Sequence, residues 1–402
     1  MKTTTARRQG GSAPRSRAGI HPPPARKRHQ ASGSPVRILT AVPICDGHDS
    51  AINTINLELI HHGIEVIYLG YHRSARDIAR AAIQEDARAI GISSYNGGHV
   101  EFFGEVIEFL KKNGAGDIGV FGGGGGTITP ADARLLAKKG VDRIFSAGTR
   151  LAEIVEFVKT RYGAPGIPTA SRTTILTDRR LAKLLTVAEL NVRGSRFEVR
   201  GSAKPSRVVG ITGPGGAGKT TLIDELAMRF LRSDPKARVA ILSHDPSLAG
   251  QGALLGDRAT MIYSQDDRVF MRSLATRGQA GGLSPATKRC LQVLKPSGFD
   301  LVLVETVGIG QEAMPFGREL INQTVLVMSP DYGSRLQLQK IVMLQEADVV
   351  VVNKSDLAGA KTAAAEIEQY LVLNHRGQKL ISTVAKRHRD PGVDELFRWL
   401  GS

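Results

Sequence analysis

The chain has 402 residues, a hydrophobic content of 41% and a formal net charge of +16. This length predicts two or three domains that each bury a core. No apolar run approaches the roughly 20 residues of a spanning helix, so we expect no membrane association. The two cysteines, Cys45 and Cys290, lie far apart in sequence. We therefore expect neither structural zinc nor a disulfide framework, and we expect a cytoplasmic location.

Much of the positive charge lies at the amino terminus. The first 37 residues hold nine Lys and Arg and no acidic residue, and removing these charges leaves +7. Residues 1–36 have no aromatic side chain and few apolar ones, which predicts a disordered basic tail. The tail resembles an organellar transit peptide in composition, but it has too few apolar residues for the amphipathic helix of such peptides. We expect no specific nucleic-acid partner.

Residues 37–162 alternate between short apolar runs and helical patterns. Ser74 before Ala-Arg-Asp predicts an N-cap with an acidic residue in the first turn. Strands separated by helices predict an α/β domain with a flavodoxin-like doubly wound sheet, which binds ligands beyond the carboxyl ends of its strands. The expected strands begin near residues 37, 64, 88, 118 and 142, and two of the expected helices begin at 74 and 99.

Residues 163–205 lose this alternation and are expected to form a linker, with a short helix near 178–190. Strand and helix patterns resume over 206–402, which predicts a second α/β domain. Its expected strands begin near residues 207, 238, 300, 324 and 348.

The second domain opens with a complete P-loop pattern directly after an apolar run. In such a loop the backbone N–H groups face phosphate oxygens, the lysine reaches the β- and γ-phosphates, and the next hydroxyl holds Mg²⁺. We expect Lys219 to be catalytic and Thr220 to bind magnesium. A glycine-rich turn without a ligand is the weaker interpretation, because the motif is complete and in the required setting. The expected nucleotide-binding residues here are Gly213, Gly215, Gly216, Ala217, Gly218, Lys219, Thr220 and Thr221.

Three further strand ends extend this site. Glu305 is expected to place a catalytic carboxylate near the metal, and Gly308 to sense the γ-phosphate. Asp245 is expected to hold Mg²⁺ through water or to orient the attacking water; the alternative is an aspartate that only forms a turn. The third is the run Asn353, Lys354, Ser355 and Asp356. Its aspartate can accept two hydrogen bonds from guanine that adenine cannot offer, so the expected nucleotide is GTP.

The first domain carries Asp46-Gly47-His48 directly after its first strand. Asp46 is close enough to accept a hydrogen bond from the histidine ring, as carboxylates do beside metal-bound histidines. The glycine run 122–126 leaves backbone without side chains where a long, flat substituent fits, and Ser93 and Ser94 end an intervening strand. A lone histidine is more usually an ordinary turn residue, so spacing alone leaves both interpretations open.

These residues together resemble a known family. Asp46-x-His48, Ser93-Ser94-Tyr95 and the glycine run resemble the cobalamin-binding signature of acyl-CoA mutases. The stretches DGHDSAIN, SSYNGGHVEFF and VFGGGGGTITP resemble the fused isobutyryl-CoA mutases of the methylmalonyl-CoA mutase family. ALLGDR, FMRSLATRG, ETVGIGQ and DYGSRLQLQK resemble their GTPase domain, which is related to the methylmalonyl-CoA mutase-associated GTPases. The likeness runs from about residue 37 to the end.

The resemblance implies a cobalamin-binding, GTP-hydrolysing component of an adenosylcobalamin-dependent acyl-CoA mutase, of the isobutyryl-CoA or methylmalonyl-CoA type. It implies that His48 replaces the benzimidazole of the cofactor as the lower cobalt ligand, and that GTP turnover gates cofactor loading. The implied partners are a large mutase barrel subunit, a cobalamin adenosyltransferase and further copies of the chain. The implied cofactor-binding residues are Asp46, His48, Ser93, Ser94, Gly122, Gly123, Gly124, Gly125 and Gly126.

The sequence departs from the family in three respects. Ala51 and Tyr95 replace the Gly and Leu of the general cobalamin signature, and the fused enzymes resemble this chain there. The loop 245–257 looks one residue shorter than the family's and lacks its usual Thr-Gly-Gly, a difference that falls on the expected switch. No barrel sequence is present, so we expect the barrel on a separate chain. The alternatives are a free-standing, GTP-switched cobalamin carrier or sensor, and a truncated mutase remnant.

Overall fold

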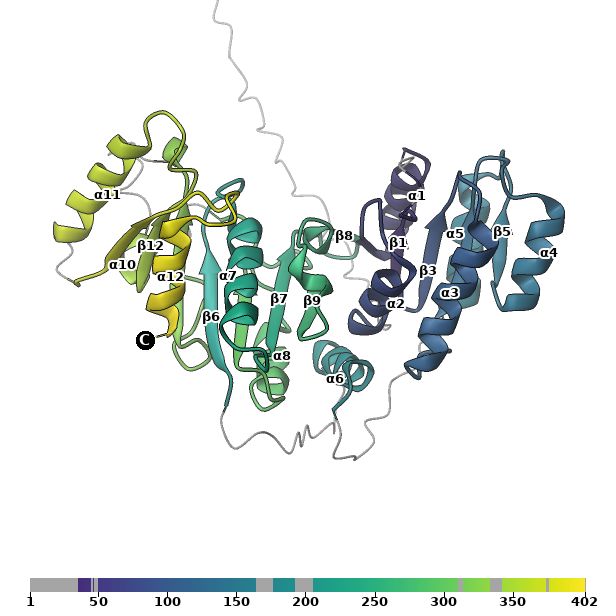
Figure 1. Ribbon diagram of the computed structural model, residues 1–402, viewed down its shortest axis with the longest axis horizontal. Helices are drawn as coiled ribbons and strands as arrows, with labels where there is room; N and C mark the ends of the chain where they lie inside the picture. Colours follow the sequence, from purple (N-terminus) through teal and green to yellow (C-terminus); the bar gives the residue numbers. More distant parts are fainter. Residues whose placement is uncertain are drawn as a thin grey trace, which may run out of the picture. The chain divides into compact units, whose positions relative to one another are not determined.

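A computed structural model describes residues 35–44, 46, 50–163, 176–191, 205–309, 314–332, 342–373 and 376–401. Within these ranges the chain forms two parallel sheets, each flanked by helices (Figure 1). Almost all of the expected basic tail lies outside the described residues, as do 164–175 and 192–204 of the expected linker. None of the described helices is both long and apolar enough to cross a membrane.

The first sheet has the strand order β5-β4-β3-β1-β2-β8, with every neighbouring pair parallel. The order of β1 to β5 is flavodoxin-like, which confirms the predicted fold class. The strands are β1 (Arg37–Ala41), β2 (Glu65–Tyr68), β3 (Ala89–Ser93), β4 (Gly119–Gly123), β5 (Arg143–Phe145) and β8 (Ala253–Leu255). The helices between them are α1 (Ser50–His61), α2 (Ala75–Gln84), α3 (His99–Lys112), α4 (Pro130–Lys139) and α5 (Leu151–Tyr162).

Helices cover both faces of this sheet because its strands are apolar on both sides. Ile78 of α2 and Phe103 of α3 pack into one core, while Leu59 of α1 and Val158 of α5 pack into the other. Ser74 caps α2, since its hydroxyl accepts a hydrogen bond from the backbone N–H three residues later. This confirms the predicted helix start.

Strand β8 is an addition that the sequence did not predict. It comes from the second half of the chain and pairs with β2, so that Ala253 lies opposite Glu65 and Leu255 opposite Ile67. Ala253 and Leu255 are buried in the same core as α2 and α3. Three residues are too few for a periodic pattern, and the partner strand lies far away in sequence.

The second sheet has the order β13-β12-β11-β6-β10-β7-β9, again entirely parallel. The five expected strands are present; β9 and β13 were not predicted. The strands are β6 (Arg207–Thr212), β7 (Val239–Asp245), β9 (Val269–Ala275), β10 (Leu301–Glu305), β11 (Gln323–Met328), β12 (Val349–Val352) and β13 (Lys379–Ser382). The helices are α6 (Asp178–Leu190), α7 (Lys219–Ser233), α8 (Thr287–Leu294), α10 (Met343–Glu346), α11 (Ala360–Leu373) and α12 (Pro391–Gly401).

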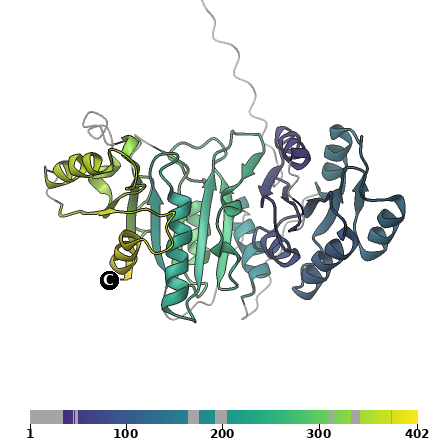
Figure 2. The same cartoon turned by 45° about the horizontal axis from the view of Figure 1, so that its top comes forward.

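Helices α7 and α12 lie side by side on one face of this sheet (Figure 2). Between them the rings of Phe230 and Phe397 pack edge to face, with 4.9 Å between the ring centroids. Helix α6, expected within the linker, packs with α8 on the other face through Leu181 and Leu185. The adjacent strands β6, β10 and β7 end at one edge, which brings the P-loop, Glu305 and Asp245 together.

Candidate functional site

The P-loop connects β6 to α7 in a conformation that only glycine adopts readily. Gly213, Gly216 and Gly218 have φ angles of 139°, 74° and 90°, in the left-handed region. Lys219 is buried at the start of α7, and its Nζ donates to the carbonyls of Gly213 and Pro214 at 3.0 and 3.1 Å. The lysine charge therefore sits inside the loop, where a phosphate group would be held.

The side chains of Thr220 and Glu305 contact each other beside the P-loop. The Thr220 hydroxyl donates to Glu305 Oε1 at 2.7 Å. Glu305 Oε2 and Asp245 Oδ2 are buried and have no hydrogen-bond partner among the described residues. Buried carboxylate oxygens are almost always paired, so these two atoms indicate a site for a cation.

Asp257 is a third carboxylate at this site, which the sequence analysis missed. It accepts a hydrogen bond from the Ser243 hydroxyl. Burial and the neighbouring Asp257 raise the pKa of Glu305 to about 8 and raise that of Asp245 well above its ordinary value. Burial raises the pKa of Asp257 too. A cation would favour the ionised form of all three. In the sequence, Asp257 lies in the segment ALLGDR, whose only signal is its resemblance to the GTPase domain of the family.

The donor set fits magnesium. Among the described residues no three His, Cys, Asp or Glu side chains are arranged to hold a metal ion by themselves. Mg²⁺ typically uses only one or two carboxylates and completes its shell with water and phosphate oxygens. The orphaned oxygens of Glu305 and Asp245 beside the Thr220 hydroxyl fit this requirement.

The expected base-binding residues follow β12. The Asn353 amide donates to the P-loop carbonyl of Ala217 at 2.9 Å and accepts from Ala385 N–H at 3.0 Å. The side chain of Asn353 therefore ties this segment to the P-loop. Lys354 adopts a left-handed φ of 59°. Asp356 forms an ion pair with Lys386 at 2.7 Å, and this contact holds the pKa of Asp356 below its usual value.

Two other expected residues lie at the loop. Gly308 approaches Gly215 so closely that a side chain would have no room. Thr221 is exposed at the start of α7. Their roles in nucleotide binding stay predictions.

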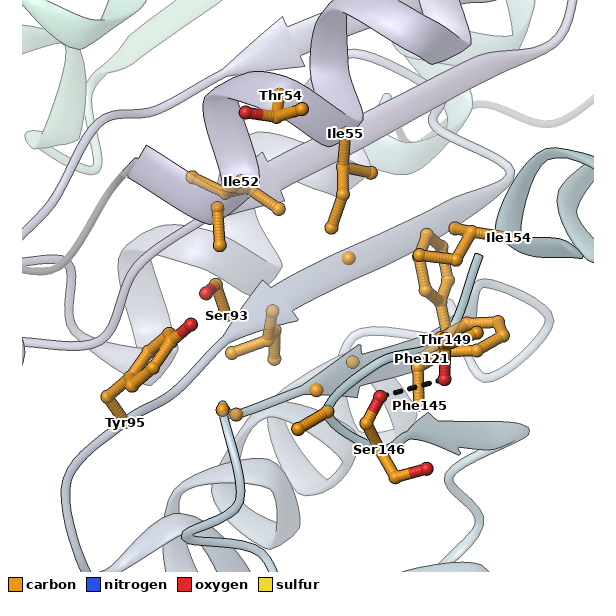
Figure 3. A pocket seen from close by; sticks show the side chains of 18 of the residues that line it. Ile52, Thr54, Ile55, Ser93, Tyr95, Phe121, Phe145, Ser146, Thr149 and Ile154 are labelled. Carbon is orange, nitrogen blue, oxygen red and sulfur yellow. Dashed lines mark hydrogen bonds between the residues drawn. The ribbon is translucent and has the colours of Figure 1, made fainter. Parts of the chain in front are cut away.

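A second candidate site is a cavity of about 540 Å³ in the first sheet (Figure 3). It opens between α1, the carboxyl ends of β3 and β4, and the loop from β5 to α5. Its size is that of a pocket for a large ligand group, and its wall is mainly apolar with a few hydroxyls. The lining residues include Ile52, Thr54, Ile55, Ser93, Tyr95, Phe121, Phe145, Ser146, Thr149 and Ile154.

The glycine run forms one wall of this cavity. Gly122 to Gly125 line it, whereas Gly126 and Ser94 are not among the lining residues. A Cβ on Gly122 would lie 2.4 Å from the carbonyl of Ile92, and one on Gly124 would lie 1.7 Å from that of Ser94. Glycine is thus required for β3 and β4 to meet here, and it leaves the cavity wall bare.

Asp46 is buried beside the cavity, and one carboxylate oxygen accepts a hydrogen bond from the backbone N–H of Tyr95. His48 lies outside the described residues, between Asp46 and the start of α1. Its role as cobalt ligand therefore stays a prediction. The sequence analysis did not single out α1 or the β5–α5 loop, although both lie at the carboxyl edge of the sheet.

Comparison with known proteins gives two family matches. Residues 181–400 match the model for the methylmalonyl-CoA mutase-associated GTPase MeaB, and residues 36–156 match the B12-binding domain.

Whole-chain relatives combine the same two parts. A fused isobutyryl-CoA mutase of Geobacillus kaustophilus is 38% identical over 90% of this chain and 36% of its own length. One of Cupriavidus metallidurans is 40% identical over 91% of this chain and 35% of its own length. A putative GTPase of Pyrococcus horikoshii is 40% identical over 55% of this chain and 72% of its own length. The chain thus spans about a third of the length of the fused relatives.

Proposed function

The chain belongs to the family of MeaB, the methylmalonyl-CoA mutase-associated GTPases, and carries a B12-binding domain ahead of it; on this basis we propose that it is the cobalamin-binding, GTP-hydrolysing component of an adenosylcobalamin-dependent acyl-CoA mutase. The observation that carries the proposal is the pairing of a P-loop carboxylate site with a glycine-walled cavity in one compact unit. Neither site alone would indicate a gated cofactor.

At the nucleotide site, the chain's residues have distinct tasks. Lys219 leaves the carbonyls of Gly213 and Pro214 and binds the β- and γ-phosphates of GTP. Mg²⁺ would be held by Thr220 and Glu305, with Asp245 acting on it directly or through water. When bound, the ion supplies positive charge to the phosphate oxygens. Asp356 selects guanine.

At the cobalamin site, Gly122 to Gly125 would leave room for the tail of the cofactor, and Ser93 would hydrogen-bond it. His48 would bind the cobalt of the cofactor, and Asp46 would orient the His48 ring. Ser94 aligns the ends of β3 and β4, since its N–H donates to the Gly123 carbonyl at 2.9 Å, and Gly126 turns the chain after β4 with a left-handed φ of 101°. The bound cofactor supplies the radical chemistry of the mutase; GTP turnover controls its loading.

The mutase activity requires a partner that supplies the substrate barrel. Isobutyryl-CoA is the favoured substrate because the fused relatives carry that name. A methylmalonyl-CoA mutase is the alternative, after the family description. The adenosyl form of the cofactor, a cobalamin adenosyltransferase partner, self-association and a cytoplasmic location complete the proposal.

Affinity purification from the native cell tests this function. It is expected to recover a large mutase subunit whose turnover of branched acyl-CoAs with adenosylcobalamin depends on this chain and on GTP. Cobalamin binding and GTP-dependent release without any acyl-CoA chemistry would instead establish a free-standing carrier. A mutase that works fully without this chain would refute the accessory role.

A further inference from the structure

The segment from Asp245 to Arg258 leaves the nucleotide site, contributes a strand to the other sheet, and returns. Asp245 ends β7 within the carboxylate cluster, and Asp257 rejoins that cluster. The backbone N–H of Gly256 approaches Asp245 Oδ1 at 3.4 Å. Between these ends lies β8, the edge strand of the cobalamin-binding domain. Two nucleotide-site carboxylates are thus joined by residues that belong to the cobalamin sheet.

Close backbone contacts hold β8 in place against the cobalamin-binding domain. The Gly252 N–H donates to the carbonyl of Ile60 at the end of α1, at 3.1 Å. A Cβ at Gly252 would lie 2.1 Å from the carbonyl of Ile64, so the backbones are in direct contact. Leu255 is fully buried in the core of the cobalamin domain.

A second contact with the cobalamin-binding domain follows directly after Asp257, at Arg258. Arg258 is buried, and it donates to Glu85 Oε1 at 3.2 Å and to Gln84 Oε1 at 3.1 Å, at the end of α2. Glu85 is fully buried and accepts in addition from the Ser273 backbone N–H and hydroxyl, both at 3.0 Å. The guanidinium is therefore fixed by a carboxylate that cannot turn away.

We propose that the cobalamin-binding domain positions Asp245 and Asp257 in the nucleotide site, through β8 and the contact of Arg258 with Gln84 and Glu85, and thereby couples cobalamin occupancy to nucleotide occupancy. The inference rests on the proposed function. A cation bound beside the two carboxylates acts on a segment that is held against the other domain at β8 and at Arg258. Cobalamin binding acts on the same segment through α1, which lines the cavity and accepts the Gly252 N–H hydrogen bond at Ile60. Such coupling is reciprocal.

Equilibrium binding to the full chain tests this coupling. The dissociation constant of Mg²⁺·GDP is measured with and without saturating adenosylcobalamin, and that of adenosylcobalamin with and without Mg²⁺·GDP. We expect both constants to change by the same factor, of about fivefold or more. Binding of both ligands with no mutual effect would overturn the inference alone, whereas failure to bind either would overturn the proposed function.

Two glycines of the segment give a matched pair of variants. Gly252→Ala places a methyl group against the Ile64 carbonyl and displaces β8, while Gly256→Ala points into open space at an ordinary φ of −107°. We expect the coupling factor to fall to near one in Gly252→Ala and to stay at the wild-type value in Gly256→Ala. Equal coupling in the two variants would contradict the role of β8.

Arg258 provides a test that does not depend on Gly252→Ala folding. Arg258→Met removes the contacts to Glu85 and Gln84, and Arg258→Lys keeps the charge beside Glu85. We expect loss of coupling and a raised Mg²⁺ requirement in Arg258→Met, with partial recovery of both in Arg258→Lys. An unchanged coupling factor in a folded Arg258→Met protein would refute the positioning role.

Discussion

Asp356 lies in the turn that follows β12, and its carboxylate is paired with Lys386. The Lys386 hydrogen bond keeps the pKa of Asp356 low, so the carboxylate is ionised throughout the neutral range. We expect Asp356→Asn to lower the preference for GTP over ATP about 100-fold, because the amide presents N–H groups to the donors of guanine. Competition binding with both nucleotides measures this. Lys386→Met, which leaves the carboxylate in place, is the control and is expected to keep the preference.

His48 is expected to be the cobalt ligand, and its ring nitrogen is directly observable. In the Co(II) form the wild-type protein is expected to show coupling of cobalt to a protein nitrogen in paramagnetic spectra. His48→Ala should lose that signal and weaken cobalamin binding. Labelling the protein with ¹⁵N distinguishes the sources, since coupling that does not respond to the label would place the cofactor's own base on cobalt.

Glu305 gives a prediction about pH. Its pKa is raised to about 8 by burial and by Asp257, while the unfolded chain titrates in the ordinary range for glutamate. The folded state therefore binds more protons than the unfolded state between these values, and the free energy of unfolding without Mg²⁺ should fall as pH rises through this window.

Denaturation in urea from pH 5 to 9 with a chelator checks this dependence. Mg²⁺ with nucleotide should restore the lost stability, and Glu305→Gln should remove this group's contribution to the slope. A free energy of unfolding that rises steadily up to pH 8 in the chelated wild type would show that Glu305 is already ionised.

At the scale of elements, α6 is fixed to both sheets by buried charge. Glu189 of α6 lies 3.3 Å from Arg37 of β1 and 3.0 Å from Arg272 of β9. Burial alone would raise its pKa, but these arginines and Arg277 outweigh burial and hold it at about 2. The stability from this depressed pKa is present above the ordinary glutamate range and is lost as pH falls toward 2.

Glu189→Gln is expected to lower the free energy of unfolding by about 3–5 kcal/mol, because the buried guanidinium of Arg272 loses its carboxylate partner and that of Arg37 loses one of its partners. Glu395→Gln serves as the exposed comparison, since Glu395 pairs with Lys379 at 2.7 Å with both side chains 43% exposed. That change should cost less than about 1 kcal/mol. Chemical denaturation at neutral pH compares the two, and equal losses would mean that the buried cluster contributes no more than a surface pair.

Elements with their own pattern were predictable, and elements defined by a distant partner were not. Strands β1 to β5 are apolar runs between amphipathic helices, so their type and order follow from local sequence. Strand β8 exists because β2 offers an open edge. Arg272 is fully buried within β9, where a charged residue weakens any strand pattern until Glu85 and Glu189 are in place.

The candidate sites divide in the same way. The P-loop, Glu305 and Asp356 sit in short motifs whose chemistry is local. Asp257 belongs to the site only because the chain returns from β8, and Tyr95 joins the cavity only because its loop faces the glycine run. Neither the place of Asp257 in the nucleotide site nor that of Tyr95 in the cavity wall follows from a fixed spacing in sequence, so neither could be predicted.

At the scale of the whole molecule, we propose that nucleotide state controls a cobalamin site in the same chain. The most direct measurement is the rate at which adenosylcobalamin loads onto the full chain, followed optically as its benzimidazole leaves cobalt. Loading is compared with Mg²⁺·GTP, with a non-hydrolysable analogue and with Mg²⁺·GDP, and Lys219→Ala serves as the variant without hydrolysis. We expect rates that differ about tenfold or more between nucleotide states in the wild type, and no difference between GTP and the analogue in Lys219→Ala. Loading at one rate in every nucleotide state of the wild type, or no displacement of the benzimidazole at all, would contradict this proposal.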